Sequence, residues 1–273
     1  MRWLVALALA LAVAAPVRAA SVDGLKVHSS SVGAGATLVF VHGWTCDASS
    51  WSGQIDAFAK QYRVITLDLP GHGQSESPRD GKFSMDLFAR AVEAVRSEAR
   101  ADRIVLIGHS MGAPVIRQYA RLYPDRVAGL VAVDGPLDLR GFPPPQLAQG
   151  PPPMTGPEGL RMRETLIRSM FVADTAPALQ EHILKMMLGA PEATAVGAMT
   201  AMFDPSLSST DVIRAPALAV YAGTAQPGDV AKIRELYPSY EAKQLAGTGH
   251  FLMMEKPAEF NRELTAFLTK IKF

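Results

Sequence analysis

The sequence predicts an α/β protein with a doubly wound, mostly parallel sheet and a helical cap inserted after the sixth strand. The first observation is that short apolar runs alternate with longer segments of helical periodicity from Thr37 onward. Each crossover between parallel strands packs its helix on the sheet, so strict alternation places helices on both faces. The second observation is one interruption, between Gly135 and Thr210, where proline-rich segments precede three more helical patterns. This interruption predicts the cap.

The predicted strands are apolar runs that are bounded by Gly, Pro or Asp and are too short to be helices. They cover residues 37–41, 63–67, 104–107, 127–133, 217–221 and 242–245, with one or two leading strands expected within residues 22–31. The helices between them are expected at residues 50–60, 85–100, 111–122, 229–236 and 258–271. Together these elements make a core of residues 20–134 and 211–273.

Residues 135–210 form the predicted cap. Prolines in residues 143–145 and 151–153 exclude regular structure there, because proline lacks an amide donor and restricts the residue before it. Helices are expected at residues 158–171, 176–188 and 192–202. The cap also carries seven methionines: Met154, Met162, Met170, Met186, Met187, Met199 and Met202. Methionine is flexible and polarizable, so these side chains either fill the core of short helices or line an adaptable apolar lid.

The composition is that of an ordinary globular protein. Of the 273 residues, 48% are apolar and 19% are charged, which argues against a disordered, collagenous or disulfide-rich protein. The formal net charge is +1, so no bulk field attracts the chain to nucleic acid or to an acidic membrane surface. Cys46 is the only cysteine, which excludes an intramolecular disulfide, and we expect it to pack as a small hydrophobe.

The N-terminal segment has the pattern of a secretory signal peptide. A positive charge at Arg2 precedes the Leu/Ala/Val run of residues 4–15, and small residues follow up to Ala20. The run has about 12 residues, too few for a hydrocarbon core that needs about 20, so a signal sequence fits better than a membrane anchor. We expect residues 1–19 to be removed by cleavage after Ala19. The mature protein is then periplasmic or secreted, with no membrane span.

The most specific motif is Gly108-His109-Ser110-Met111-Gly112, which lies directly between a predicted strand and a predicted helix. A serine at such a sharp turn is lifted above the sheet, and small neighbours are needed where a side chain would clash with strand and helix. The pattern therefore predicts Ser110 as a nucleophile, with the Met111 amide facing a developing oxyanion. His109 points elsewhere from a tight turn, and we expect it to be structural.

Two further motifs carry a resemblance to a known family. His42-Gly43-Trp44 follows the strand at residues 37–41, and residues 68–75 read Asp-Leu-Pro-Gly-His-Gly-Gln-Ser. With the serine motif, the chain resembles the α/β-hydrolase fold family, specifically its serine hydrolase branch with a helical cap. The resemblance implies that the Trp44 amide is the second oxyanion donor and that the loop at residues 68–75 frames the pocket. His42 and His72 then have positioning roles.

The general base is expected near the C-terminus. Gly249-His250 is followed by Glu255 and Pro257, which resembles the family's G-H-x-x-x-x-E-x-P segment. A histidine that follows the serine in chain order, in the loop after the last strand, matches the chain order of this family. We therefore predict that His250 takes the proton of the nucleophile.

The acid has two candidates. The resemblance implies an acid in the loop after the strand at residues 217–221, but Gln226 stands at the expected position. Asp134 follows the strand at residues 127–133 directly, and Asp229 lies three residues beyond Gln226. Asp134 could instead stabilise the turn that leads into the helical insertion, and Asp229 could be the N-cap residue of the helix that follows it. We favour Asp134 and keep Asp229 as the alternative.

These residues make up an acyl-transfer site. We expect a serine-dependent hydrolase that cleaves carboxylic esters of small to medium apolar substrates through an acyl-enzyme. A lactonase, an amidase, a carbon–carbon hydrolase or a cofactor-free perhydrolase would use the same residues, and a catalytically silent binding protein would keep only the fold. No clustering of His, Cys and acidic residues suggests a metal, so we expect no cofactor and a small-molecule substrate.

Overall fold

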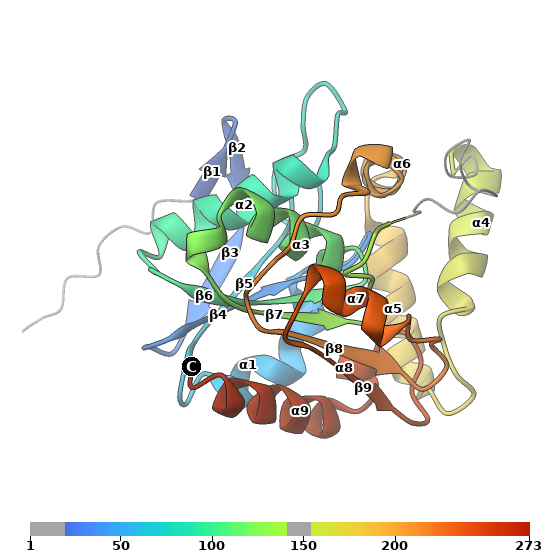
Figure 1. The fold of residues 1–273 in the computed structure, drawn as a ribbon. Helices are drawn as coiled ribbons and strands as arrows, with labels where there is room; N and C mark the ends of the chain where they lie inside the picture. The colour runs from blue at the N-terminus through green and yellow to red at the C-terminus, as the bar shows by residue number, and fades with distance from the viewer. Residues whose placement is uncertain (1–19, 141–153) are drawn as a thin grey trace, which may run out of the picture.

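The computed structural model describes residues 20–140 and 154–273 and has the predicted α/β architecture (Figure 1). Seven strands form one sheet in the order β3-β5-β4-β6-β7-β8-β9, in which β3 is antiparallel to β5 and all other neighbours are parallel. The predicted signal peptide and the proline-rich residues 141–153 lie outside the described residues. The expected mostly parallel sheet is confirmed.

The parallel strands lie close to their predicted positions. They are β4 (Thr37–Val41), β5 (Arg63–Leu67), β6 (Ile104–His109), β7 (Val127–Val133), β8 (Ala217–Ala222) and β9 (Tyr240–Leu245). The leading segment differs from the prediction, because it forms three strands: β1 (Ala20–Val22), β2 (Leu25–Val27) and β3 (Ser29–Val32). β1 and β2 pair only with each other, in a separate antiparallel hairpin. A tight turn at Asp23 and Gly24, both at positive φ, allows this hairpin.

Helices cover both faces of the sheet. α2 (Met85–Glu98) and α3 (Gly112–Leu122) pack together on one face, whereas α1 (Ser52–Phe58) and α9 (Pro257–Lys270) pack on the other (Figure 1). Two shorter helices, α7 (Val230–Leu236) and α8 (Leu252–Glu255), follow β8 and β9. Every residue of β4 and β6 is buried, as expected of central strands that are covered on both sides. The doubly wound arrangement therefore places the core on both sides of these two strands.

The cap emerges between β7 and β8, as predicted. It consists of α4 (Gly156–Arg168), α5 (Pro177–Gly189) and α6 (Glu192–Met202). α6 is attached to the core by two hydrogen bonds, from the Trp44 indole Nε1 to the Ala195 carbonyl and from the Thr194 hydroxyl to the Gly71 carbonyl, both 2.8 Å. Within the described residues, no helix is both long and apolar enough to cross a bilayer.

Candidate active site

Ser110 lies in the strained turn that connects β6 to α3. Its φ is +51°, a value that a residue with a side chain adopts at a cost of about 1–3 kcal/mol. The turn is held by two backbone hydrogen bonds, from the Ser110 amide to the Val133 carbonyl and from the Ala113 amide to the Ser110 carbonyl, both 2.9 Å. The serine side chain is therefore presented at the carboxyl edge of the sheet, where ligands bind in open α/β sheets.

The glycines that flank Ser110 are required by close packing. A Cβ at Gly108 would lie 2.3 Å from the Gly112 carbonyl oxygen, and a Cβ at Gly112 would lie 2.4 Å from the Val41 carbonyl oxygen. Atoms of a real side chain do not approach backbone so closely. This contact brings the first turn of α3 against β4, as the sequence motif suggested. The helix N-terminus is thereby fixed beside the nucleophile.

His250 and Asp134 form a hydrogen bond of 2.6 Å between the imidazole Nδ1 and the carboxylate Oδ2. The second oxygen of Asp134, Oδ1, accepts a hydrogen bond of 2.9 Å from the Ala222 amide. Burial acts to raise the pKa of Asp134, but the hydrogen bond and the charge of His250 outweigh it, so this pKa is lowered. The carboxylate is therefore in its ionised form at neutral pH and orients the His250 ring so that Nε2 faces away from it.

Asp229 has a different place. Its carboxylate caps α7 by accepting hydrogen bonds from the amides of Ala231 at 2.9 Å and Lys232 at 3.4 Å. Asp229, Gln226, Asp134 and His250 border a cavity of about 510 Å³. Of the two candidate acids, the structure thus brings Asp134 to the histidine and uses Asp229 as a helix cap. The catalytic roles of these residues stay predictions.

The two predicted oxyanion donors lie on either side of the turn. Trp44 comes shortly after β4, and Met111 is the residue before α3. Both residues are buried, with 4% and 0% of their surface exposed. Among the described residues, neither of the two backbone amides donates a hydrogen bond. Buried amides without an acceptor are rare, and two of them near Ser110 fit a site where an anionic oxygen binds.

Three other histidines are fully buried and bind backbone groups. His42 donates from Nδ1 to the Gly43 carbonyl and accepts at Nε2 from the Leu69 amide, and His72 donates from Nδ1 to the Pro70 carbonyl. His109 donates from Nε2 to the His250 carbonyl at 2.9 Å. Burial is the main cause that lowers all three pKa values, to about 3 for His72 and for His109. These neutral rings hold loops in place, in agreement with their predicted positioning roles.

The buried Asp68 organises the loop that follows β5. Its two carboxylate oxygens accept hydrogen bonds from the Ala48 amide at 2.8 Å, the Gln74 amide at 2.9 Å and the His28 ring at 3.0 Å. A single carboxylate therefore joins the start of η1 (Ala48–Trp51) to the loop at residues 68–75. Near it, burial raises the pKa of the Cys46 thiol to about 12, which leaves this group protonated and unreactive.

The cap is attached directly to the histidine loop. The His250 amide donates a hydrogen bond of 3.0 Å to the carbonyl of Met170, which follows α4. Glu255 accepts from the Gly249 amide at 2.7 Å and from the Thr175 hydroxyl at 3.4 Å, so it connects the same two segments. The sequence motif singled out Glu255, but it did not indicate that this carboxylate contacts the cap.

The methionines of the cap are mostly in contact with the core. Met154, Met187 and Met199 are buried, and Met170, Met186 and Met202 are partly buried against the same hydrophobic cluster. Met162 is 37% exposed. Packing accounts for the three buried side chains, and the lid interpretation stays a prediction for the others. Among residues 20–140 and 154–273, no three His, Cys, Asp or Glu side chains are placed to hold a metal ion.

Comparisons with known proteins assign the chain to one family. A family model described as the alpha/beta hydrolase fold matches residues 36–162. The chain is 32% identical to the 2-hydroxy-6-oxononadienedioate/2-hydroxy-6-oxononatrienedioate hydrolase of Paraburkholderia phymatum, over 89% of this chain and 91% of that relative. It is 31% identical to the dihydrolipoyllysine-residue acetyltransferase component of the acetoin cleaving system of Cupriavidus necator, over 93% of this chain and 70% of that relative.

The fold is also similar to solved structures. A thermophilic esterase from Thermogutta terrifontis superposes with a TM-score of 0.81 at 24% identity, over 93% of this chain and 97% of that one. At this level of identity the similarity concerns the fold alone.

The buried neutral histidines predict how stability depends on pH. Since the folded-state pKa of His72 is lowered, the unfolded chain binds more protons between about pH 3 and pH 6.5, and stability increases with pH in that window. We expect His72→Asn to reduce the slope of unfolding free energy against pH by about 1.4 kcal/mol per unit. Urea unfolding at several values from about pH 4 to pH 6 measures this slope.

The matched control is His182→Asn, because His182 is exposed on α5. We expect this control to retain the wild-type slope. An unchanged slope in His72→Asn would show that the ring is not kept neutral by burial.

Proposed function

Because the chain belongs to the α/β-hydrolase fold family, we propose that it is a serine hydrolase that cleaves carboxylic esters of small to medium apolar molecules through an acyl-enzyme. The observation that carries the proposal is the arrangement at the carboxyl edge of the sheet. Ser110 stands in a strained turn there, and Asp134, at the end of the neighbouring strand β7, is hydrogen-bonded to His250 in the loop after β9. The amides of the buried residues Trp44 and Met111 donate no hydrogen bond within the described part of the chain.

The proposed reaction uses each of these groups in turn. Ser110 attacks the ester carbonyl while His250 accepts its proton at Nε2, the nitrogen that does not face Asp134. The amides of Trp44 and Met111 stabilise the negative charge on the carbonyl oxygen, and the ionised Asp134 stabilises the imidazolium. His250 then returns the proton to the departing alcohol. Water releases the acyl group by the same steps, with no cofactor.

Carbon–carbon bond hydrolysis is a second candidate, since the Paraburkholderia relative is named as a hydrolase of 2-hydroxy-6-oxo dienedioates. The same serine, histidine and amides would serve such a reaction. A serine rather than an aspartate at the turn argues against epoxide opening, in which a carboxylate attacks carbon. Assaying p-nitrophenyl esters of increasing chain length beside lactones, amides and a 2-hydroxy-6-oxo dienoate separates these activities.

Substitution of Ser110 tests its proposed role as the nucleophile. Ser110→Ala should reduce kcat for p-nitrophenyl esters by at least about 10⁴-fold, because the attacking oxygen is lost. The variant should fold normally, as measured by circular dichroism and thermal unfolding. A fluorophosphonate should label wild-type protein at Ser110 in a one-to-one ratio, which mass spectrometry of the labelled peptide measures. Residual activity within tenfold of wild type, or a label elsewhere, contradicts the serine mechanism.

A second prediction separates the two aspartates. Asp134→Asn should lower kcat by up to about 10⁴-fold, because the imidazolium loses its charged partner and the wrong tautomer is favoured. Asp229→Ala should leave kcat near the wild-type value and cost about 0.5–2 kcal/mol of stability through the lost helix cap. Steady-state kinetics and urea unfolding of both variants provide the comparison. The assignment fails if Asp229→Ala is the variant that loses activity.

We also propose that the protein is exported to the periplasm or secreted after cleavage behind Ala19. In support, Ala20 is the first residue of β1 and is only 5% exposed, so cleavage there leaves the N-terminal hairpin whole. Expression with the native N-terminus in a Gram-negative host should yield a periplasmic protein that begins at Ala20, as measured by intact mass. An uncleaved chain in the cytoplasmic fraction contradicts this proposal.

A further inference from the structure

The inward face of α4 carries a charged residue where an apolar one is expected. The residues of this helix that are buried are Gly159, Arg163 and Ile167, which are spaced four apart and share one face. On the outer surface of the same helix, Leu160 and Met162 are 43% and 37% exposed. Packing alone would favour the opposite placement, with the apolar side chains inside and the arginine in solvent. The position of Arg163 therefore needs another explanation.

Arg163 is buried, and two of the three nitrogens of its guanidinium have no partner among the described residues. The residue is 4% exposed, and its Nε and Nη1 atoms have no hydrogen-bond acceptor. No carboxylate of the described residues lies within ion-pair distance, and residues 1–19 and 141–153 contain no Asp or Glu in the sequence. A buried charge without a counter-charge is unfavourable by several kcal/mol, according to the general cost of desolvating an ion.

Arg117, which is also buried, shows how an arginine with a structural role is bonded. Only 1% of it is exposed, and its guanidinium donates to the Leu207 carbonyl and to the carbonyl and hydroxyl of Ser209, at 2.9 to 3.1 Å. These bonds connect α3 to the segment that leads out of the cap. Arg163 makes no comparable bond to the described residues, so its charge is available to a ligand.

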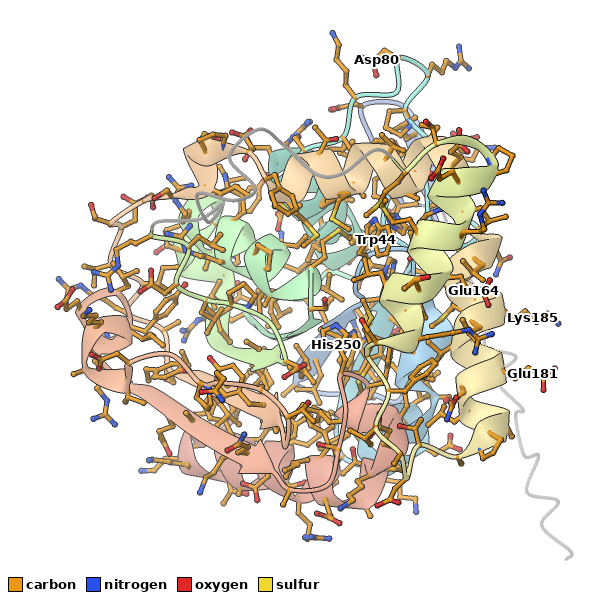
Figure 2. The ribbon with its side chains drawn as sticks, turned by 90° about the vertical axis from the view of Figure 1, so that its right-hand side faces the viewer. Trp44, Asp80, Glu164, Glu181, Lys185 and His250 are labelled. Carbon is orange, nitrogen blue, oxygen red and sulfur yellow. The ribbon has the colours of Figure 1, made fainter. Side chains whose placement is uncertain are left out.

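The C-terminal end of α4, the helix that carries Arg163, lies next to the histidine loop. Met170, whose carbonyl binds the His250 amide, follows Arg163 by seven residues, which corresponds to about 10 Å along a helix. Figure 2 shows α4 crossing the side of the molecule on which Trp44 and His250 lie, while Glu181 and Lys185 of α5 point outward.

The other two cap helices close the same space. Sδ of Met186, on α5, accepts hydrogen bonds from the hydroxyls of Ser49 at 3.6 Å and Ser50 at 3.5 Å, next to the oxyanion loop. α6 is bound to Trp44 through the Ala195 carbonyl. The cap helices α5 and α6 therefore contact the segment that follows β4.

We infer that Arg163 binds an anionic group of the substrate, and that the ester cleaved by Ser110 carries a carboxylate on its acyl or its alcohol side. A guanidinium presents a planar fork of donors that matches the two oxygens of a carboxylate. Removal of the ligand from water is offset by its attraction to a guanidinium that is buried and has no acidic partner among the described residues. This inference rests on the proposed ester hydrolysis and names its class of substrate.

Matched pairs of esters test the inference by kinetics. On the acyl side, mono-p-nitrophenyl adipate is compared with p-nitrophenyl hexanoate, and on the alcohol side 4-acetoxybenzoate is compared with 4-acetoxybenzamide. We expect Arg163→Met to lower kcat/KM for the anionic member of one pair by about 10- to 100-fold, mainly through KM, because a charge-assisted hydrogen bond is lost. The neutral member should change less than about threefold.

The matched control is Arg161→Met, which removes the same charge from an exposed position of the same helix. We expect it to leave all four rates near their wild-type values. Equal losses for the anionic and neutral members of both pairs in Arg163→Met would overturn the inference and leave Arg163 a packing residue. If Arg163→Met does not fold, Arg163→Gln and the inhibition of wild type by adipate against hexanoate decide the question by the same contrast.

A binding measurement separates this inference from the proposed reaction. In Ser110→Ala protein, calorimetry should show that adipate binds at least about tenfold more tightly than hexanoate, since only adipate has a second carboxylate for Arg163. The difference should disappear in the double variant with Arg163→Met. If wild type cleaves no ester but adipate still binds in this way, the reaction is wrong and the anion site stands. If esters are cleaved but adipate has no advantage, the anion site is wrong.

Discussion

The placement of the proposed catalytic residues depends on the hydrogen-bond ladder at the carboxyl end of the sheet. The Ser110 amide, just beyond β6, binds the last carbonyl of β7 at Val133, and the Asp134 amide, just beyond β7, binds Val220 of β8. Both residues then leave the sheet at positive φ, +51° and +44°. The ladder thus extends one residue past each strand before the chain turns. Nucleophile and acid are held at neighbouring positions by backbone bonds, independently of their side chains.

The acid is oriented by a second set of contacts of the same kind. The Ala222 amide at the end of β8 donates to one oxygen of Asp134, which leaves the other oxygen for His250. The backbone of the histidine is bound in turn, since its carbonyl accepts from the His109 ring and its amide donates to the Met170 carbonyl. Each side chain of the proposed triad is therefore positioned by the sheet or by the cap, in the way that a preorganised site requires.

The cap contributes more than a cover. It is joined to the core at three places. A hydrogen bond from Trp44 reaches it from the loop after β4, and one to Gly71 reaches it from the loop at residues 68–75. The third is the bond between Met170 and the histidine loop. Its inward face is mainly apolar, which suits the hydrophobic part of an ester. The unpaired charge of Arg163 is an exception to this composition, and a molecule that has both an apolar segment and a carboxylate would complement both features. In the proposed function, the scaffold supplies the reaction and the cap supplies the selection among substrates.

The amino-acid sequence by itself determined the fold and most of the candidate site. The strands at β4, β5 and β7 have their predicted bounds, because strands buried on both faces are continuous apolar runs that glycine, proline or aspartate interrupts. Ser110 and His250 were predicted from local motifs, since the roles proposed for them require a particular turn and its neighbours. The leading segment was less regular, because short edge strands are decided by pairing rather than by periodicity.

Only the tertiary structure showed that Asp134, and not Asp229, is hydrogen-bonded to His250, and only it revealed that Arg163 is buried. Both aspartates come after a strand, and both can cap a turn. They differ in which of them reaches His250, and Asp134 is separated from that histidine by 116 residues of sequence. Likewise, α4 has both exposed and buried positions, and its sequence does not predict that Arg163 is one of the buried ones. Distances between segments that are far apart in sequence depend on tertiary packing, so a local pattern of residues cannot predict them.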